Sequence, residues 1–178
     1  MNICVFGAAS NSISPAYIAE GEALGRILAA RGHAVVFGGG GNGMMGAVAR
    51  GAHEGGGEIV GVAPTFFPDG AFSPFCTAFH YTETMHERKL KMETLSDAFI
   101  VTPGGIGTYE EFMEVFTLRH LSRHEKPIAL LNTNGFFDPL WALLVHTADE
   151  GFLPRKDLDL IFMSSAIDEI LAYIEATG

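Results

Sequence analysis

The sequence predicts a single α/β domain that is doubly wound and Rossmann-like, with helices covering both faces of a parallel sheet. Short runs that are apolar at every position alternate along the chain with longer segments of helical periodicity. A strand without polar alternation is buried on both faces, as in a parallel sheet covered by helices. The chain has 178 residues, of which 48% are hydrophobic and 18% charged, so one domain over residues 1–178 accounts for it.

The elements follow one another in strand–helix order. NICVFG (2–7), HAVVFG (33–38), EIVGVA (58–63), AFIVT (98–102) and PIALLN (127–132) are the apolar runs that predict strands. A stripe of Ile18, Leu24, Ile27 and Leu28 predicts a first helix that ends near Arg31. Further helices are predicted over residues 43–54, 84–95, 108–121, 136–150 and 166–176. Residues 64–80, rich in Phe, Pro and Gly, are predicted to form a loop.

Charge and composition exclude several classes of partner. The formal net charge of −10 opposes binding to nucleic acid or to an anionic membrane surface, although one local group of N–H donors can still hold a small phosphate. The two cysteines, Cys4 and Cys76, lie far apart in apolar contexts and indicate neither a disulfide framework nor a zinc site. The first residues lack the basic region of a signal peptide, and the chain has no apolar stretch of about eighteen residues. A cytoplasmic location is therefore predicted.

The first glycine-rich loop, FGGGGNGMMGAVARGA, follows the second predicted strand. Gly41, Gly43 and Gly46 have the G-x-G-x-x-G spacing of dinucleotide-binding loops. Such a site also needs an acidic residue at the end of the next strand, whereas Glu58 lies at the beginning of that strand. This disfavours NAD. Either a tight turn that lets a helix approach the sheet or direct contact with another ligand explains these glycines.

The second glycine-rich loop, VTPGGIGTYEEF, follows the fourth predicted strand. Pro103 ends the strand, and the glycines after it let backbone N–H groups converge at a helix start, which favours binding of an anion such as phosphate. The segment from Thr108 to Glu111 also has the spacing of a capping box, with Thr108 as N-cap. Both glycine-rich loops should lie at the carboxyl edge of the sheet, where open α/β domains bind ligands.

PGGIGTYEE (103–111) matches the PGGxGTxxE signature of the cytokinin phosphoribohydrolase family, members of which are often labelled lysine decarboxylases. The chain resembles that family from about residue 2 to residue 151. The resemblance includes the block MHERKLKMETLSDAFIVTPGGIGTYEEFMEVFT (85–117), the loop GGGGNGMMGAVARGA (38–52), GEIVGVAP (57–64) and HEKPIALLNTNGFFDPL (124–140).

The resemblance implies a hydrolase that splits the N-glycosidic bond of adenine-type nucleoside 5′-monophosphates, N6-modified ones included, into free base and ribose 5-phosphate. It implies a small-molecule substrate, no cofactor, no metal, and a homodimer or a multiple of dimers. By position in the motifs, Arg88 and Glu111 become the catalytic residues. The substrate-binding residues become Lys89, Gly104, Gly105, Ile106, Gly107, Thr108, Tyr109, Glu110 and Thr117.

The chemistry of these residue types agrees with those roles. Cleavage of an N-glycosidic bond develops positive charge on the ribose and negative charge on the departing base, so a carboxylate can activate water and stabilise the sugar. A permanently charged arginine can bind phosphate or stabilise the leaving base. Without the resemblance, Arg88 and Lys89 in HERKLK would be assigned to a solvated helix face. Apolar Met113, Val115 and Phe116 on the helix of Glu111 favour a homodimer packed through that helix.

The chain departs from the family at two places. Where relatives have a Trp-x-Gln continuation after the motif helix, this chain has TLRH, residues 117–120. The segment PTFFPDGAFSPFCTAFH (64–80) is strongly aromatic, and Asp69 is its only acidic residue, although relatives carry a substrate-contacting glutamate in this region. Both differences concern the preference for a base and leave the phosphate loop and the catalytic pair intact.

Other side chains have two interpretations each. His120 and His124 have an i,i+4 spacing that can bind a metal, but a helix C-terminus also favours histidine. Three phenylalanines of the aromatic segment can stack on a base or pack in the core or an interface, namely Phe72, Phe75 and Phe79. Ser10 and Asn11 can contact a ligand or simply form a turn.

Two other functions are compatible with parts of the sequence. Molybdenum-cofactor carrier proteins have a related fold and a similar glycine loop, so a non-catalytic carrier of that cofactor or of a nucleotide is the main alternative. A carrier has no need of an Arg88–Glu111 pair. A pyridoxal-dependent decarboxylase is disfavoured, because Lys89 and Lys91 lie in a charged helical segment without the pattern of a cofactor pocket.

Overall fold

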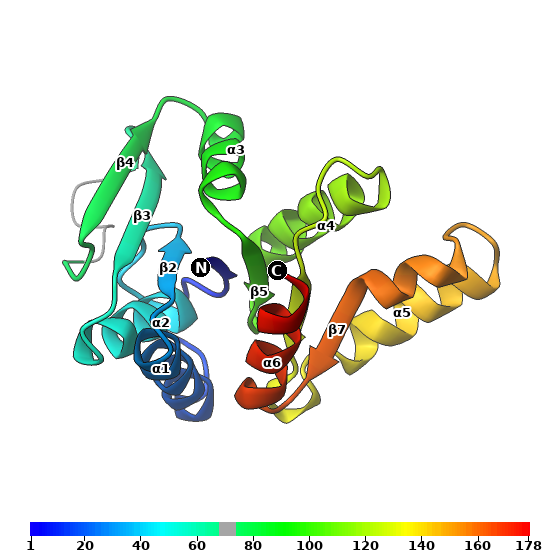
Figure 1. The fold of residues 1–178 in the computed structure, drawn as a ribbon, viewed down its shortest axis with the longest axis horizontal. Helices are drawn as coiled ribbons and strands as arrows, with labels where there is room; N and C mark the ends of the chain where they lie inside the picture. The colour runs from blue at the N-terminus through cyan, green and yellow to red at the C-terminus, as the bar shows by residue number, and fades with distance from the viewer. Residues whose placement is uncertain (68–73) are drawn as a thin grey trace.

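Seven parallel strands form one sheet in the computed structural model, which describes residues 1–67 and 74–178 (Figure 1). The strands are β1 (Asn2–Phe6), β2 (Ala34–Phe37), β3 (Ile59–Pro64), β4 (Ala78–Thr82), β5 (Ala98–Val101), β6 (Ile128–Leu131) and β7 (Ile161–Ser164). Their order across the sheet is β4-β3-β2-β1-β5-β6-β7, and every neighbouring pair is parallel. The predicted Rossmann-like α/β class is thus confirmed.

Helices cover both faces of this sheet. They are α1 (Pro15–Ala30), α2 (Gly43–Glu54), α3 (Met85–Leu95), α4 (Ile106–His120), α5 (Asp138–Asp149) and α6 (Ile167–Thr177), with short 3-10 turns η1 (Thr133–Gly135) and η2 (Arg155–Leu160). The helices α1, α2 and α6 pack against one face, and α3, α4 and α5 against the other. In the described ranges, no helix is both long enough and apolar enough to cross a membrane.

Alternation along each strand divides the core into two layers. In β1, Ile3 and Val5 belong to the layer under α1, α2 and α6, whereas Cys4 and Phe6 belong to the layer under α3, α4 and α5. All four side chains are buried. A strand between two helical layers therefore needs apolar residues on both faces, which explains why its sequence shows no polar alternation.

The outermost strands, β4 and β7, were absent from the five strands that the sequence predicts. Strand β4 overlaps the end of the predicted loop at residues 64–80, and its side chains are half-buried or exposed. Strand β7 is short, and three of its four side chains are half-buried. An edge strand does not need a continuous apolar run, so the pattern that identifies the inner strands misses it. Phe72 and Asp69, which the sequence singles out in the loop, lie outside the described residues.

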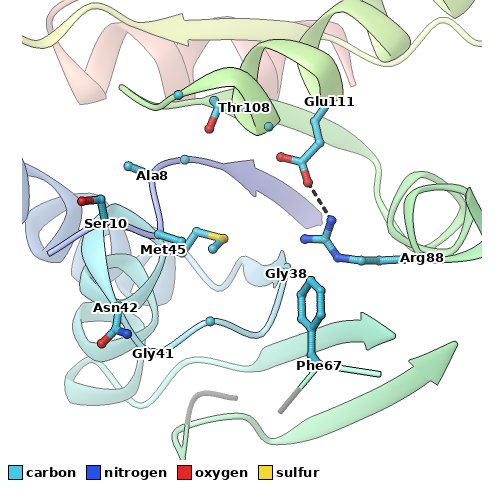
Figure 2. Close-up of a pocket in the computed structure, with 15 residues that line it drawn as sticks. Ala8, Ser10, Gly38, Gly41, Asn42, Met45, Phe67, Arg88, Thr108 and Glu111 are labelled. Atoms are coloured by element: carbon cyan, nitrogen blue, oxygen red, sulfur yellow. Dashed lines mark hydrogen bonds and ion pairs between the residues drawn. The ribbon is translucent and has the colours of Figure 1, made fainter. Parts of the chain in front are cut away.

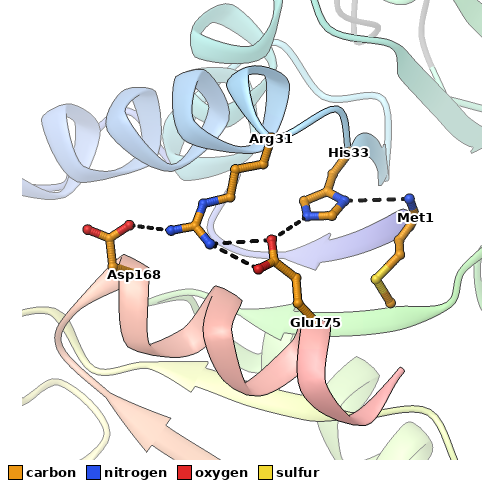
Figure 3. Close-up of polar contacts among 5 residues, drawn as sticks. All are labelled: Met1, Arg31, His33, Asp168 and Glu175. Carbon is orange, nitrogen blue, oxygen red and sulfur yellow. Dashed lines mark hydrogen bonds and ion pairs between the residues drawn. The ribbon is translucent and has the colours of Figure 1, made fainter.

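A cluster of charged groups joins α6 to the turn after α1 at the amino edge of the sheet (Figure 3). Arg31 pairs with Asp168 at 2.6 Å and with Glu175 at 3.1 Å, and Nε2 of His33 lies 2.9 Å from Glu175. The amino group of Met1 lies 3.5 Å from Nδ1 of His33. Hydrogen bonds from His33 and Arg31 lower the pKa of Glu175. The cluster lies at the end of the sheet opposite to its carboxyl edge.

Candidate active site

The loops that follow β1, β2 and β5 meet at the carboxyl edge of the sheet and enclose a pocket (Figure 2). The chain adds β2, β3 and β4 on one side of β1, and then β6 and β7 on the outer side of β5. The strand order therefore reverses at the β1–β5 pair, which is the switch point of the sheet. The pocket volume of about 450 Å³ lies within the range typical of small-molecule sites. Both glycine-rich loops contribute to it, as the sequence predicts.

The loop after β2 has both of the roles that its glycines allow. Gly43 begins α2 at φ +59°, and a Cβ there would lie 2.5 Å from the carbonyl oxygen of Ala8. Its N–H donates to Oδ1 of Asn11 at 3.0 Å, which fixes the turn to the loop after β1. Gly41 lines the pocket instead, together with Ser10. Of the two turn residues considered above, Asn11 therefore supports the turn and Ser10 faces the pocket.

The loop after β5 leads directly into α4. Helix α4 begins at Ile106 with Gly105 as its N-cap, two residues earlier than predicted. The predicted capping box is therefore wrong: Thr108 lies inside the first turn, buried, and Glu111 lies in the second turn. Gly105, Gly107 and Thr108 line the pocket, with the Thr108 side chain directed into it.

Two helices start at this pocket, and their N-termini differ in the N–H groups that they can offer. At α2, the N–H of Gly43 donates to Asn11, and the N–H of Met45 donates to Ala8 at 3.2 Å. At α4, the first internal bond is that from Tyr109 to Gly105, so the N–H groups before it have no acceptor within the helix. Together with the helix dipole, these N–H groups favour an anion at the start of α4.

Arg88 and Glu111 form a buried ion pair beside this helix start. Helix α3 begins after Thr84, whose hydroxyl accepts a hydrogen bond from the N–H of Glu87 at 3.1 Å. Arg88 lies one turn further along α3 and is 6% exposed. Its partner Glu111 lies on α4 and is 9% exposed. Nη1 of Arg88 lies 3.0 Å from Oε1 of Glu111, and its Nε donates to the carbonyl of Val62 at 3.2 Å. The interpretation of Arg88 as part of a solvated helix face is thus wrong.

Gly38 makes room for the guanidinium group. A Cβ on Gly38 would lie 2.0 Å from Nη2 of Arg88 and 3.4 Å from Sδ of Met45. The end of β2 must therefore lack a side chain for Arg88 to reach Glu111. The glycine brings the guanidinium and the thioether to one wall of the pocket.

Burial and charge act in opposite directions on Glu111. Burial raises the pKa of its carboxyl group, and the nearby charge of Arg88 together with their hydrogen bond opposes that rise. A carboxylate whose pKa is raised accepts a proton more readily than an exposed one, which suits a general base. The pair therefore has the properties needed to activate a water molecule next to a bound anion.

The remaining residues implied by the resemblance lie outside this pocket. Lys89 pairs instead with Glu110 and, at 2.7 Å, with Glu114, on the outer side of α3 and α4. Five residues of the predicted substrate set do not line the pocket in this chain: Lys89, Ile106, Tyr109, Glu110 and Thr117. Gly104 lines a smaller apolar cavity, which shares Ala8, Ser10 and Gly105 with this pocket. Their contact with substrate stays a prediction.

The histidines at the end of α4 have separate partners. Nδ1 of His120 lies 2.6 Å from Asp157, and Nε2 of His124 lies 3.0 Å from the carbonyl of Val115. His120 is the last residue of α4, as expected for a histidine favoured by a helix C-terminus. Within the described part of the chain, no group of three or more His, Cys, Asp or Glu residues has the arrangement of a metal site.

Sequence reasoning missed Phe67 and Met45, which both line the pocket. Of the three phenylalanines considered instead, Phe75 packs against the core and stacks on His53 with ring centroids 4.8 Å apart. Phe67 lies in the turn that follows the end of β3 at Pro64, so the rule that ligands bind beyond the carboxyl ends of strands would have selected it. Met45 lies between Gly43 and Gly46 of the G-x-G-x-x-G spacing, so it could have been proposed as a ligand contact together with that loop.

Comparisons with known proteins agree with this arrangement. Residues 45–174 match a protein-family model described as "Possible lysine decarboxylase". A cytokinin riboside 5′-monophosphate phosphoribohydrolase of Rhodococcoides fascians is 38% identical over 98% of this chain and 89% of its own length. A probable enzyme of the same name from Oryza sativa subsp. japonica is 37% identical over 97% of this chain and 71% of its own.

Among solved structures, the molybdenum cofactor binding protein of the phototrophic bacterium Rippkaea orientalis is similar, with a TM-score of 0.77. The match covers 98% of this chain and 95% of that one, at 21% sequence identity. At that identity the likeness concerns the fold. It adds to the assignment of the Rossmann-like architecture and carries no information on ligand.

Proposed function

The chain belongs to the family of nucleotide phosphoribohydrolases, and we propose that it hydrolyses the N-glycosidic bond of purine nucleoside 5′-monophosphates. The products are the free base and ribose 5-phosphate. The observation that carries this proposal is the buried Arg88–Glu111 pair, which lies in one pocket with the helix start suited to phosphate. The adenine-type base and its N6 modification are what the resemblance of the motifs implies, and the relatives are named as phosphoribohydrolases of cytokinin riboside 5′-monophosphate.

The geometry supports a defined orientation of the substrate. The phosphate binds at the start of α4, where Gly105, Gly107 and Thr108 face the pocket. Glu111 comes one turn after Thr108 on the same helix, so its carboxylate lies next to the ribose of a nucleotide held in this way. In this orientation the phosphate lies at the glycine loop and the ribose lies at the ion pair.

Glu111 acts as the general base in this proposal. Its carboxylate takes a proton from water while the water oxygen bonds to C1′ of the ribose, and the C1′–N bond breaks with its electron pair going to the base. The departing nitrogen takes a proton from solvent and Glu111 then releases its proton to solvent, so the net reaction adds one water molecule across the C1′–N bond. The same carboxylate stabilises the positive charge that develops on the sugar.

Arg88 holds Glu111 and supplies charge to the leaving side. Its Nε and Nη1 are bonded to Val62 and Glu111, whereas Nη2 has no hydrogen-bond partner among the described residues and points into the pocket. A guanidinium N–H at that place can donate to the departing base. Since arginine does not lose its proton in proteins, the charge is present throughout the reaction.

The phosphate is expected to dominate substrate recognition. The enzyme should hydrolyse AMP with a kcat/KM about 10²-fold or more above that for adenosine, because only AMP reaches the N–H groups at the start of α4. The rate of adenine release, measured by chromatography at a series of concentrations of AMP and of adenosine, gives this ratio. Equal kcat/KM values would contradict the placement of the phosphate.

Two other functions have less support. A non-catalytic carrier would bind a nucleotide or molybdenum cofactor without turnover, so release of free base from AMP distinguishes it from the proposed enzyme. A pyridoxal-dependent decarboxylase needs a lysine to hold the cofactor as a Schiff base. No lysine lines the described pocket. Partial burial acts to lower the pKa of Lys89, but the hydrogen bonds that its ammonium group donates to Glu110 and Glu114 outweigh this effect and raise the pKa. Lys89 is therefore a poor nucleophile.

We also propose that the chain forms a homodimer, on different grounds from those that the sequence provides. Val115 and Phe116 are buried within the chain and leave no apolar surface, so that part of the expectation was wrong. Ile106 at the start of α4 is 83% exposed, and Leu90 on α3 is 54% exposed. Burial of such side chains in a symmetric contact would stabilise a dimer. Light scattering at micromolar concentration should give twice the mass of the chain, and a monomer would refute the proposal.

A further inference from the structure

The pocket has a polar side and an apolar side. Thr108, Glu111 and Arg88 provide its hydroxyl, carboxylate and guanidinium groups. Phe67 provides an aromatic ring beyond Arg88, and Met45 provides a thioether beside the guanidinium, next to Gly38. Figure 2 shows this order across the pocket, with Glu111 above, Arg88 in the middle and the Phe67 ring below.

Phe67 is held in place by its own turn. Its N–H donates to the carbonyl of Pro64 at 3.1 Å, which closes a tight turn at the end of β3. Its ring meets that of Phe66 edge to face, with centroids 5.5 Å apart and planes at 86°. Phe66 is 60% exposed and does not line the pocket, so the two neighbouring rings have different surroundings. The half-buried ring of Phe67 is the one directed at Arg88.

The order of groups across the pocket matches the order of groups in a nucleotide. If the phosphate binds at Gly105 and Gly107 and the ribose faces Glu111, then the base extends beyond Arg88 toward Phe67. An aromatic ring and a polarizable sulfur are groups that contact the face of a heterocycle favourably. No side chain with a negative charge lies on this wall of the described pocket, so an uncharged, flat ligand group suits it.

We propose that Phe67, assisted by Met45, binds the base of the nucleotide by stacking and sets the preference for purines over pyrimidines. This inference rests on the proposed function and assigns its base-binding residue. A purine offers a two-ring face to Phe67 and a pyrimidine only one ring, so loss of the aromatic ring costs more with AMP than with CMP. Stacking contributes to binding without hydrogen bonds to particular base atoms, so substituents on the base are tolerated.

Equilibrium binding to AMP and to ribose 5-phosphate separates the base from the rest of the nucleotide. Calorimetry is performed in the Glu111→Gln background, which slows turnover of AMP during the titration. Phe67→Ala should weaken AMP binding about 5- to 150-fold, the range for one stacked base, and leave ribose 5-phosphate binding unchanged. It should also weaken CMP binding less than AMP binding. Phe67→Tyr should bind AMP as the parent does.

Phe66→Ala is the matched control, because it removes the same ring one residue earlier, outside the pocket. It should weaken AMP binding much less than Phe67→Ala does, because the turn that places Phe67 remains although the edge contact between the two rings is lost, and it should leave ribose 5-phosphate binding unchanged. Unchanged AMP binding by Phe67→Ala, or equal weakening of AMP and ribose 5-phosphate, would overturn the assignment of Phe67. Failure of both ligands to bind the parent chain would instead overturn the proposed function, and this assignment with it. If Phe67→Ala does not fold, Phe67→Leu tests the same loss of an aromatic face at nearly constant volume.

Discussion

Replacement of Glu111 with glutamine is expected to lower kcat for nucleoside 5′-monophosphate hydrolysis about 10²-fold or more. Glutamine preserves the shape of the side chain and can still accept the hydrogen bond from Arg88, which now measures 3.0 Å. It cannot take a proton from water or oppose the positive charge on the sugar. Steady-state rates of base release at saturating AMP, together with a melting curve to establish folding, measure the effect.

Glu114→Gln provides a control on the same helix. Glu114 lies one turn further along α4 and pairs with Lys89 at 2.7 Å, outside the pocket, so its replacement should leave kcat unchanged. Should Glu111→Gln keep the parental rate, another carboxylate must activate the water. Among the described residues no other carboxylate lines the pocket, which makes that result a refutation of the site itself.

The pH profile gives Glu111 a second signature. Its carboxyl pKa is raised by burial, and only the carboxylate is active as a base. Activity should therefore fall as the pH is lowered through a value above that of an ordinary glutamate. This acidic limb should be missing from the residual activity of Glu111→Gln, because glutamine does not titrate.

The inner part of the fold could be predicted because each inner strand is buried by helices on both sides. The runs that became β1, β2, β3, β5 and β6 are apolar at successive positions for this reason. Strands β4 and β7 lie at the two edges of the sheet, so each has a neighbouring strand on one side only, and their apolar pattern is interrupted. A continuous apolar run therefore identifies only those strands that are buried on both faces.

The site could be predicted in its chemistry but not in its spatial arrangement. The glycine motif and the resemblance selected Arg88 and Glu111, which the fold brings into one buried pair although they are 23 residues apart. The start of α4 was misplaced because TYEE has a capping pattern, whereas the glycine at position 105 ends the loop without a side-chain cap. Phe67 has no motif around it. Its role depends on the end of β3 lying next to the ends of β2 and β1, which is a property of the sheet order.

Replacement of Arg88 with methionine is expected to reduce both activity and stability, the latter by about 3–5 kcal/mol at neutral pH. Methionine fills a similar volume but leaves the Glu111 carboxylate, 9% exposed, without its counter-charge, and leaves the carbonyl of Val62 without its donor. The pKa of Glu111 must then rise further, because burial is no longer opposed by a positive charge. Urea unfolding measures the loss, and base release from AMP measures the activity.

The double variant Arg88→Met with Glu111→Gln tests whether this loss comes from an unpaired charge. Glutamine carries no charge to bury, so the double variant should be more stable than Arg88→Met alone, while both remain inactive. In the single variant the folded chain holds a proton on Glu111 more strongly than the unfolded chain does. Its stability should therefore approach that of the double variant as the pH is lowered. If the two variants unfold at the same urea concentration at every pH, the ion pair is not what holds Arg88 and Glu111 in the pocket, and only packing of the arginine side chain would account for the cost.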